Sequence, residues 1–156
     1  MESKFNPFEK LNNEWALVTA GDKKKFNSMT ISWGGFGVLW FKNVITIYLR
    51  PQRYTLEFLN KNDIFTVSFF DEKYKKDLGV LGSKSGRDCD KLSLTNLTPK
   101  FLKQGITYNE ASKTYVLKKI YQNQFNEKNI PNEIKNKFYN GEQPHIMIIG
   151  EILEVI

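Results

Sequence analysis

Cysteine and histidine are nearly missing from this chain of 156 residues, which has one of each, Cys89 and His145. A single cysteine excludes an internal disulfide and a cysteine-built metal site. A single histidine excludes a multi-histidine metal site and a conventional triad with Cys89. Asp88 and Asp90 flank Cys89, and their negative charges disfavour a thiolate, so we expect no cysteine nucleophile. We predict that the protein holds no metal.

Long apolar runs are absent as well. Residues 1–7 contain no apolar core of signal-peptide length. Apolar stretches such as Val38–Phe41 are far too short to span a bilayer. The chain has the length of one domain, so we expect a single domain over residues 1–156, in a soluble cytoplasmic protein with no membrane partner.

The composition favours a folded, β-rich protein with an anionic partner. Hydrophobic residues make up 40% of the chain and aromatic residues 14%, with many Phe and Tyr. The net charge of +6 is compatible with nucleic acid, a membrane surface or a phosphorylated cofactor. Nucleic-acid binding would require a basic face with exposed aromatic residues between the charges. Here the basic residues are scattered, so we do not expect a nucleic-acid partner.

Periodicity and turn residues predict the secondary structure. Strands are expected at 15–20, 26–33, 44–50, 64–70, 114–124 and 145–156, the last of them broken at Gly150-Glu151. Short helices are expected at 55–60 with Thr55 or a neighbour as N-cap, at 71–78 with Asp71 as cap, and at 131–139. Because no regular helical crossovers separate the strands, we predict a mainly β fold, an antiparallel β-barrel with short helices.

The stretch from residue 27 to residue 55 has the composition of a ligand site. Its first part, Asn27-Ser28-Met29-Thr30-Ile31-Ser32-Trp33, precedes a glycine pair that lets a flat ligand approach the backbone. Its second part, Arg50-Pro51-Gln52-Arg53-Tyr54-Thr55, offers many donors to an anion just before a helix N-terminus. The alternatives are that Trp33 fills the core and that the arginines pair with carboxylates such as Glu57. A flavin nucleotide, with its polar ring and phosphate, would suit both parts.

Two further features are open to two interpretations each. The loop Gly82-Ser83-Lys84-Ser85-Gly86-Arg87-Asp88, with Lys91 after it, can wrap a phosphate or be an ordinary surface loop; it lacks the P-loop spacing. His145 follows Pro144 at the start of a strand, which places it at a barrel rim. It has either a structural role or a role beside a substrate.

Taken together and in order, these motifs resemble the flavin reductase-like family, whose fold is the FMN-binding split barrel. The resemblance implies a Greek-key barrel, a homodimer, and one FMN per subunit near the dimer interface. It also implies that His145 is catalytic and lies near the nicotinamide, although relatives often carry Gly-Asp-His where this chain has Gln143-Pro144-His145. The residues that it implies for FMN binding are Asn27, Ser28, Met29, Thr30, Ser32, Trp33, Arg50, Gln52, Arg53, Tyr54, Thr55, Ser83, Lys84, Ser85, Gly86 and Lys91.

The function that we predict is that of an FMN-binding oxidoreductase. It would be an NAD(P)H:flavin reductase or a flavoredoxin-like electron-transfer protein, with a flavin or a protein as electron acceptor. A flavin supplies its own redox chemistry, which agrees with the lack of convincing paired carboxylates. The alternative is a non-catalytic FMN-binding protein that stores flavin or carries electrons without NAD(P)H.

Overall fold

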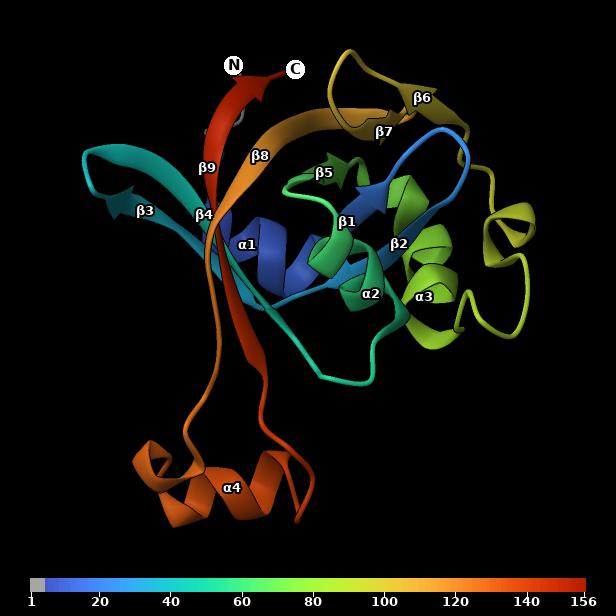
Figure 1. Ribbon diagram of the computed structural model, residues 1–156. Coiled ribbons are helices and arrows are strands. Elements are labelled where there is room, and N and C mark those ends of the chain that lie inside the picture. The colour runs from blue at the N-terminus through green and yellow to red at the C-terminus, as the bar shows by residue number, and fades with distance from the viewer. Residues whose placement is uncertain (1–4) are drawn as a thin grey trace.

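The computed structural model describes residues 5–156 and folds them mainly into antiparallel β structure (Figure 1). The strands are β1 Ala16–Gly21, β2 Phe26–Ile31, β3 Gly34–Leu39, β4 Lys42–Leu49, β5 Ile64–Phe70, β6 Pro99–Phe101, β7 Ile106–Tyr108, β8 Ala111–Gln124 and β9 Ile146–Val155. The α-helices are α1 Pro7–Glu9, α2 Tyr54–Lys61, α3 Lys75–Ser83 and α4 Asn132–Phe138. A π-helical turn, Lys10–Glu14, continues α1, and 3₁₀ turns span Glu72–Tyr74, Lys91–Leu94 and Glu127–Asn129. None of the helices in residues 5–156 has the length and apolar character needed to cross a membrane.

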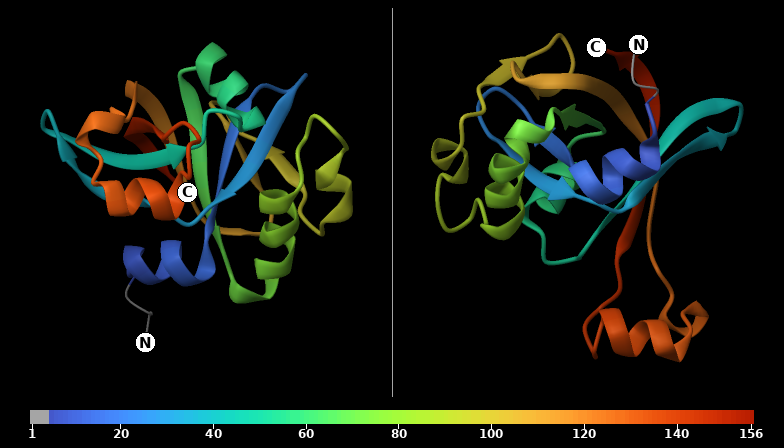
Figure 2. Two further views of the ribbon diagram at one scale, coloured as in Figure 1. Left: turned by 90° about the horizontal axis from the view of Figure 1, so that it is seen from below. Right: turned by 180° about the vertical axis from the view of Figure 1, so that it is seen from behind.

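Seven strands form one sheet in the order β2-β1-β5-β8-β9-β4-β3, and every neighbouring pair is antiparallel. Strands β6 and β7 form a small separate sheet. The predicted mainly β, antiparallel architecture is confirmed. The large sheet is strongly twisted, but within residues 5–156 no pairing joins its edge strands β2 and β3, so the barrel is open rather than closed (Figure 2).

The sheet buries apolar side chains on both of its faces. Adjacent residues of a strand point to opposite faces, so Leu17 and Val18 enter different clusters. Val18 packs with Phe65 and Leu117 in the larger cluster, inside the curve of the sheet. Leu17 packs in a smaller cluster that includes Leu78 and Leu81 of α3. Because both faces of β1 and β5 are buried, the sequences of these two strands are nearly continuous apolar runs and do not alternate with polar residues.

The predicted break at Gly150-Glu151 is wrong, because β9 continues through both residues and pairs with β4 and β8 there. Gly150 has a packing role. A Cβ atom at this position would lie 2.7 Å from the Phe65 ring and 3.0 Å from Cβ of Leu117. The glycine therefore makes room for the core side chains of two neighbouring strands and does not form a turn.

Other predicted elements are shifted or incomplete. Strands β3, β6 and β7 were not expected, and β3 contains Gly34, Gly35 and Gly37, which have low β-propensity. Strand β2 ends at Ile31, before Trp33. Asp71 precedes a 3₁₀ turn and its side chain makes no capping hydrogen bond, while α3 starts only at Lys75 and reaches Ser83. The predicted helix at 71–78 is therefore displaced toward the C-terminus.

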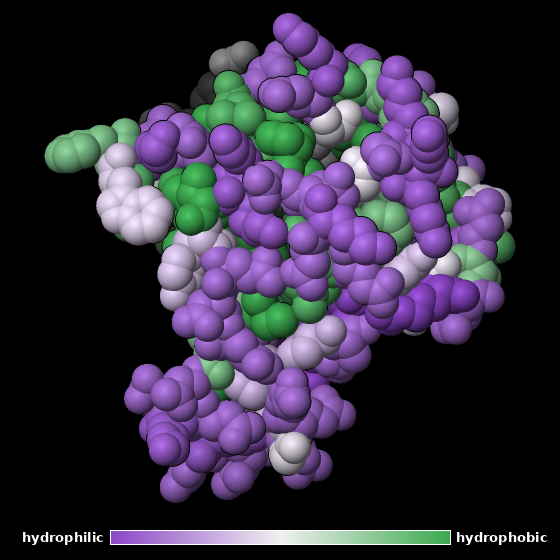
Figure 3. All heavy atoms as spheres, viewed as in Figure 1, coloured by the Kyte–Doolittle hydropathy of each residue, from purple (hydrophilic) through white to green (hydrophobic). Residues whose placement is uncertain are grey.

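The hairpin of β3 and β4 projects from the body and ends in two exposed aromatic residues. Trp40 and Phe41 form its two-residue turn, with φ angles of 51° and 59°. This turn type favours Asn-Gly, because residues other than glycine seldom adopt positive φ. The side chains of Trp40 and Phe41 are 62% and 106% exposed. In Figure 3 this tip projects at the left of the view, where a pale green side chain extends beyond the body next to a pale lilac ring.

Strands β8 and β9 extend beyond the rest of the sheet and carry the segment 125–145, which contains α4 (Figure 1). This segment stands apart from the body, below the end of β4. Its position brings the C-terminal end of the segment, at His145, close to the corner between β2 and β3. The insertion thus supplies one wall of the region that is described next.

We expect Gly150→Ala to lower the free energy of unfolding by about 1–3 kcal/mol, the usual cost of overpacking a core. Gly37→Ala is the matched control, since a Cβ atom there would meet nothing within 4 Å. Urea unfolding followed by circular dichroism measures both variants. Equal stability of Gly150→Ala and the wild type would contradict the packing role of Gly150.

Candidate functional site

A groove of about 430 Å³ lies where β2, the β4–α2 turn and the segment after α3 meet. We call it the cationic groove. It is lined by Asn27, Met29, Arg50, Gln52, Arg53, Tyr54, Thr55, Ser83, Lys84, Ser85, Gly86, Arg87, Asp88 and Lys91. Three sequence motifs that are far apart in the chain therefore line one cavity.

A smaller pocket of about 130 Å³ shares Met29, Arg50 and Arg53 with the cationic groove and extends it toward His145. Its other lining residues are Thr30, Ile31, Ser32, Trp33, Tyr48 and His145. The two cavities together contain every residue that the sequence assigned to FMN binding except Ser28. The hydroxyl of Ser28 lies 2.7 Å from that of Thr19 and 2.5 Å from that of Tyr108, in the interior behind β2. The structure does not bring its side chain into the groove.

Asn27 joins the three segments that form the groove. Its side-chain amide donates a 2.8 Å hydrogen bond to Oγ1 of Thr55, in the first turn of α2. Gly86 packs against the same amide, where a Cβ atom would lie 2.3 Å from Oδ1 of Asn27. Arg53, not Thr55, is the N-cap residue of α2, and its side chain makes no capping hydrogen bond. Thr55 instead links the helix to β2.

The cations of the groove are only partly neutralised by the protein. Arg53 donates a 3.2 Å hydrogen bond to the carbonyl of Gly82 and forms no ion pair within residues 5–156. The buried ammonium of Lys91 donates to the carbonyls of Leu81 and Lys84, at 2.9 and 3.1 Å. Burial, together with the positive charge of Arg53, lowers the pKa of Lys91 to about 8. An anion in the groove would relieve this unfavourable accumulation of charge.

Arg87 is a groove residue that the sequence did not assign to FMN binding. It donates to the carbonyl of Gln52 at 2.9 Å, pairs with Glu57, and lies 4.9 Å from the centre of the Tyr54 ring. The sequence suggested Glu57 as a partner for Arg50 or Arg53, but Arg87 is the residue that pairs with it. The only signal in the sequence was its place in the loop 82–88, which does not reveal a contact across 30 residues.

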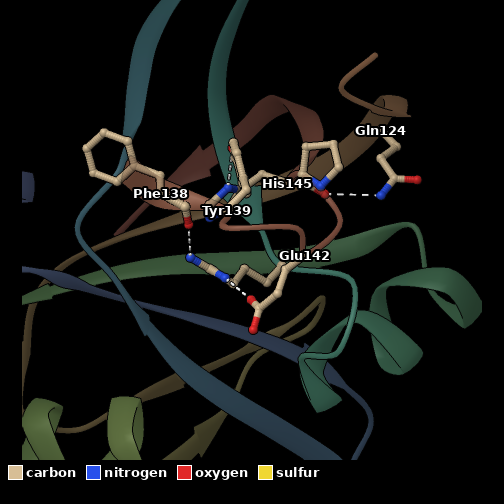
Figure 4. Close-up of polar contacts among 7 residues, drawn as sticks. Gln124, Phe138, Tyr139, Glu142 and His145 are labelled. Atoms are coloured by element: carbon tan, nitrogen blue, oxygen red, sulfur yellow. Dashed lines mark hydrogen bonds and ion pairs between the residues drawn. The ribbon is translucent and has the colours of Figure 1, made fainter. Parts of the chain in front are cut away.

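His145 is buried beside the smaller pocket, among aromatic side chains (Figure 4). Its Nδ1 lies 2.7 Å from the hydroxyl of Tyr139, and its ring centre lies 5.3 Å from that of Trp33. Burial lowers the pKa of His145, and the positive charges of Arg50 and Arg53 lower it further. Both effects favour the neutral form of the imidazole.

Arg50 connects the segment 125–145 to the groove. Its guanidinium forms a 2.5 Å ion pair with Glu142 and donates a 2.8 Å hydrogen bond to the carbonyl of Phe138 (Figure 4). The Phe138 ring packs edge-on against Trp33. These contacts hold the wall of the pocket near His145 in place. Arg50 thus has an ion pair and a hydrogen bond to a carbonyl, whereas Arg53 has only its hydrogen bond to the carbonyl of Gly82.

Comparison with protein families identifies the chain. The model of the flavin reductase-like domain matches residues 8–155. The chain belongs to the flavin reductase-like family. The resemblance that the motifs suggested is thereby confirmed. No curated protein matches the sequence significantly.

Solved structures share the fold of this flavin reductase-like chain at low sequence identity. An FMN-binding protein from Thermus thermophilus is 20% identical, with a TM-score of 0.72 over 91% of this chain and 70% of that one. The flavoredoxin from Methanosarcina acetivorans is 20% identical, with a TM-score of 0.70 over 100% of this chain and 75% of that one. The styrene monooxygenase flavin reductase from Pseudomonas putida is 12% identical, with a TM-score of 0.66 over 92% of this chain and 79% of that one. The predicted FMN-binding split-barrel fold is confirmed.

We expect Arg50→Met to raise the pKa of His145, because the substitution removes a nearby positive charge. Arg50→Lys, which keeps the charge, is the control. The chain has one histidine, so its imidazole signals in an NMR pH titration need no assignment. The wild-type pKa should lie below the ordinary 6.5, so this group should reduce the stability of the protein as pH falls below that value. An unchanged pKa in Arg50→Met would show that the charge of Arg50 does not act on His145.

Proposed function

We propose that this flavin reductase-like protein binds FMN along the cationic groove and the smaller pocket and transfers electrons through it. The observation that carries the proposal is the position of Arg53 and Lys91. Both are incompletely neutralised, and both line a cavity that continues to the hydroxyl and aromatic side chains of Ser32 and Trp33. An FMN-binding protein and a flavoredoxin among the structural relatives support this assignment.

The residues present fit the chemistry of FMN. Arg53, Lys84, Arg87 and Lys91 supply cationic donors for the phosphate, and Ser83, Ser85 and the backbone around Gly86 supply further donors. In this proposal Asn27, Gln52 and Thr55, which line the cationic groove, would contact the ribityl chain. Thr30, Ser32 and Trp33, which line the smaller pocket, would lie nearer to the ring. When bound, the flavin supplies hydride and electron transfer at its ring system. The protein then has to bind it, orient it and control access to it.

We expect Arg53→Ala to weaken FMN binding by about 1.5–3 kcal/mol, the scale of a charged hydrogen bond. Lys103→Ala, an exposed cation outside the groove, is the control for loss of charge alone. Fluorescence titration of FMN with each protein measures the affinity. If Arg53→Ala bound FMN as tightly as the control, the groove would not be the phosphate site.

We further propose that the protein is an NAD(P)H:flavin oxidoreductase in which a reduced nicotinamide delivers hydride to N5 of the flavin. The flavin reductase among the relatives supports this assignment, and His145 lines the smaller pocket. The acceptor would be a flavin or a protein. The flavoredoxin among the relatives supports the alternative, an FMN-binding electron carrier or storage protein that does not use NAD(P)H.

Anaerobic titration of the FMN-loaded protein with NADH and then NADPH separates these two functions. Bleaching of the flavin band near ~450 nm is expected for a reductase. His145→Ala should slow the bleaching and leave FMN affinity unchanged, if His145 lies beside the nicotinamide. Equal rates in the variant and the wild type would assign His145 a structural role. Bound flavin that neither nucleotide bleaches would favour the electron carrier.

We also propose a homodimer, as the family resemblance implied. The exposed tip of the β3–β4 hairpin supports this proposal. Val38, Trp40 and Phe41 present apolar side chains there, and Trp40 and Phe41 occupy backbone positions that favour glycine or asparagine. Burial of these side chains against a second subunit would compensate for the unfavourable turn.

A further inference from the structure

Lys91 closes the segment that follows α3 with its own side chain. Its ammonium group reaches back to the carbonyls of Leu81 and Lys84, at 2.9 and 3.1 Å. Lys84 is the C-cap residue of α3, so one charged group holds the two ends of segment 84–91 together. This segment follows α3 at the right of Figure 1 and supplies one side of the cationic groove.

The C-terminal end of α3 brings two cations to the same place. The last carbonyls of a helix have no partner within the helix and carry partial negative charge. Lys91 donates to the carbonyl of Leu81, and Arg53 donates to that of Gly82 at 3.2 Å. No carboxylate of residues 5–156 forms an ion pair with either cation. Two like charges are therefore held close together without a full counter-charge.

The ammonium of Lys91 has one donor left for a ligand. An ammonium carries three N–H groups, and the two carbonyls accept from two of them. The side chain is buried, yet it lines both the cationic groove and a neighbouring pocket of about 260 Å³. Lys91 thus stands between two cavities, and its third donor is available to an anion there.

Several parts of the fold contribute charge around Lys91. The cations that line the same two cavities are Lys24, Lys25, Arg50, Arg53, Lys84 and Arg87. The acidic groups that line them are Tyr54, Asp88, Cys89, Asp90 and Tyr108. Burial and the charge of Arg53 lower the pKa of Lys91 to about 8, although Cys89 acts in the opposite direction. Burial raises the pKa of Tyr108, so this hydroxyl keeps its proton where Lys91 titrates.

We propose that Lys91 couples the binding of an anion in the cationic groove to the uptake of one proton. In its charged form, the side chain holds the ends of segment 84–91 together and offers the groove a cation. As the pH rises, the free site releases this proton to solvent, and an anion in the groove causes its uptake again. The inference rests on the proposed function, in which the anion is the phosphate of FMN. Arg53 and Arg87 cannot take this role, because a guanidinium stays charged.

The test is calorimetric titration of the protein with FMN at about pH 8.5, in two buffers of different ionisation enthalpy. The second pKa of a phosphate monoester is about 6, so FMN is already a dianion and the uptake reports on the protein. We expect about 0.5–0.8 proton per FMN, because most of the free Lys91 is neutral at this pH. FMN should also bind about five- to tenfold more weakly at about pH 9 than at about pH 7, as one linked proton requires.

Lys91→Met removes the titrating group and keeps the length of the side chain. It should take up less than about 0.2 proton and lose the change of affinity with pH. Lys84→Met, at an exposed cation of the same groove, is the matched control, which loses a charge and should keep the proton uptake. Cys89→Ser should also keep the uptake, which would exclude the neighbouring thiol as its source.

Wild-type protein alone is sufficient to overturn the inference. FMN binding without proton uptake, and with equal affinity at both pH values, would do so even if Lys91→Met did not fold. Equal uptake in Lys91→Met and the wild type, or loss of uptake in Cys89→Ser, would assign the proton to another group.

Failure of the proposed function gives a different result. If FMN does not bind, the titration is made with sulfate, which remains a dianion over this pH range. Sulfate binding with proton uptake would support the role of Lys91 and contradict the assignment of the groove to FMN. The absence of binding by both anions would overturn both proposals.

Discussion

The arrangement of the site depends on the close contact between Asn27, Thr55 and Gly86. The hydrogen bond from Asn27 to Thr55 joins an edge strand to the first turn of α2, and the missing side chain of Gly86 lets the segment after α3 approach the same amide. Arg53 and Arg87 add further links between the same segments, through the carbonyls of Gly82 and Gln52. The residues at this contact are thus small and polar, and the arginine and lysine side chains line the groove beside it.

The cavities near this contact differ in the charge of their lining residues. The groove on the side of α2 and α3 gathers arginine and lysine side chains, and burial together with the charge of Arg53 lowers the pKa of Lys91 there to about 8. Within residues 5–156, the groove on the side of α4 is lined mainly by rings and aliphatic chains and by no lysine or arginine. His145, Trp33 and Ser32 line both the groove on the side of α4 and the smaller pocket that adjoins the cationic groove.

Local sequence predicted the main strands well and the packing details poorly. The strand predicted at 64–70 has the observed bounds of β5, and the strand predicted at 44–50 overlaps most of β4, Lys42–Leu49. Both were predictable because β-branched and aromatic runs are typical of buried strands. The prediction at Gly150 was wrong because a glycine in a strand can mark either a turn or a site where neighbouring side chains pack directly against the backbone. Only the positions of Phe65 and Leu117 in the folded protein show that the second case applies. Strand β3 was missed because its glycines carry little β-propensity, although pairing with β4 is sufficient to form it.

The sequence by itself determined the class of the protein: a mainly β chain without a disulfide or a multi-histidine metal site, carrying two donor-rich motifs in an order that the flavin reductase-like family shares. Only the tertiary structure decided which donors lie together. It turned Ser28 into the interior, added Arg87 to the groove, and placed His145 against Tyr139 and Trp33. The physical reason is that a local sequence pattern carries information only about interactions between residues that are close in the chain. Contacts such as that of Arg87 with Gln52 and Glu57, in contrast, join segments about 30 residues apart that meet only once the sheet has formed.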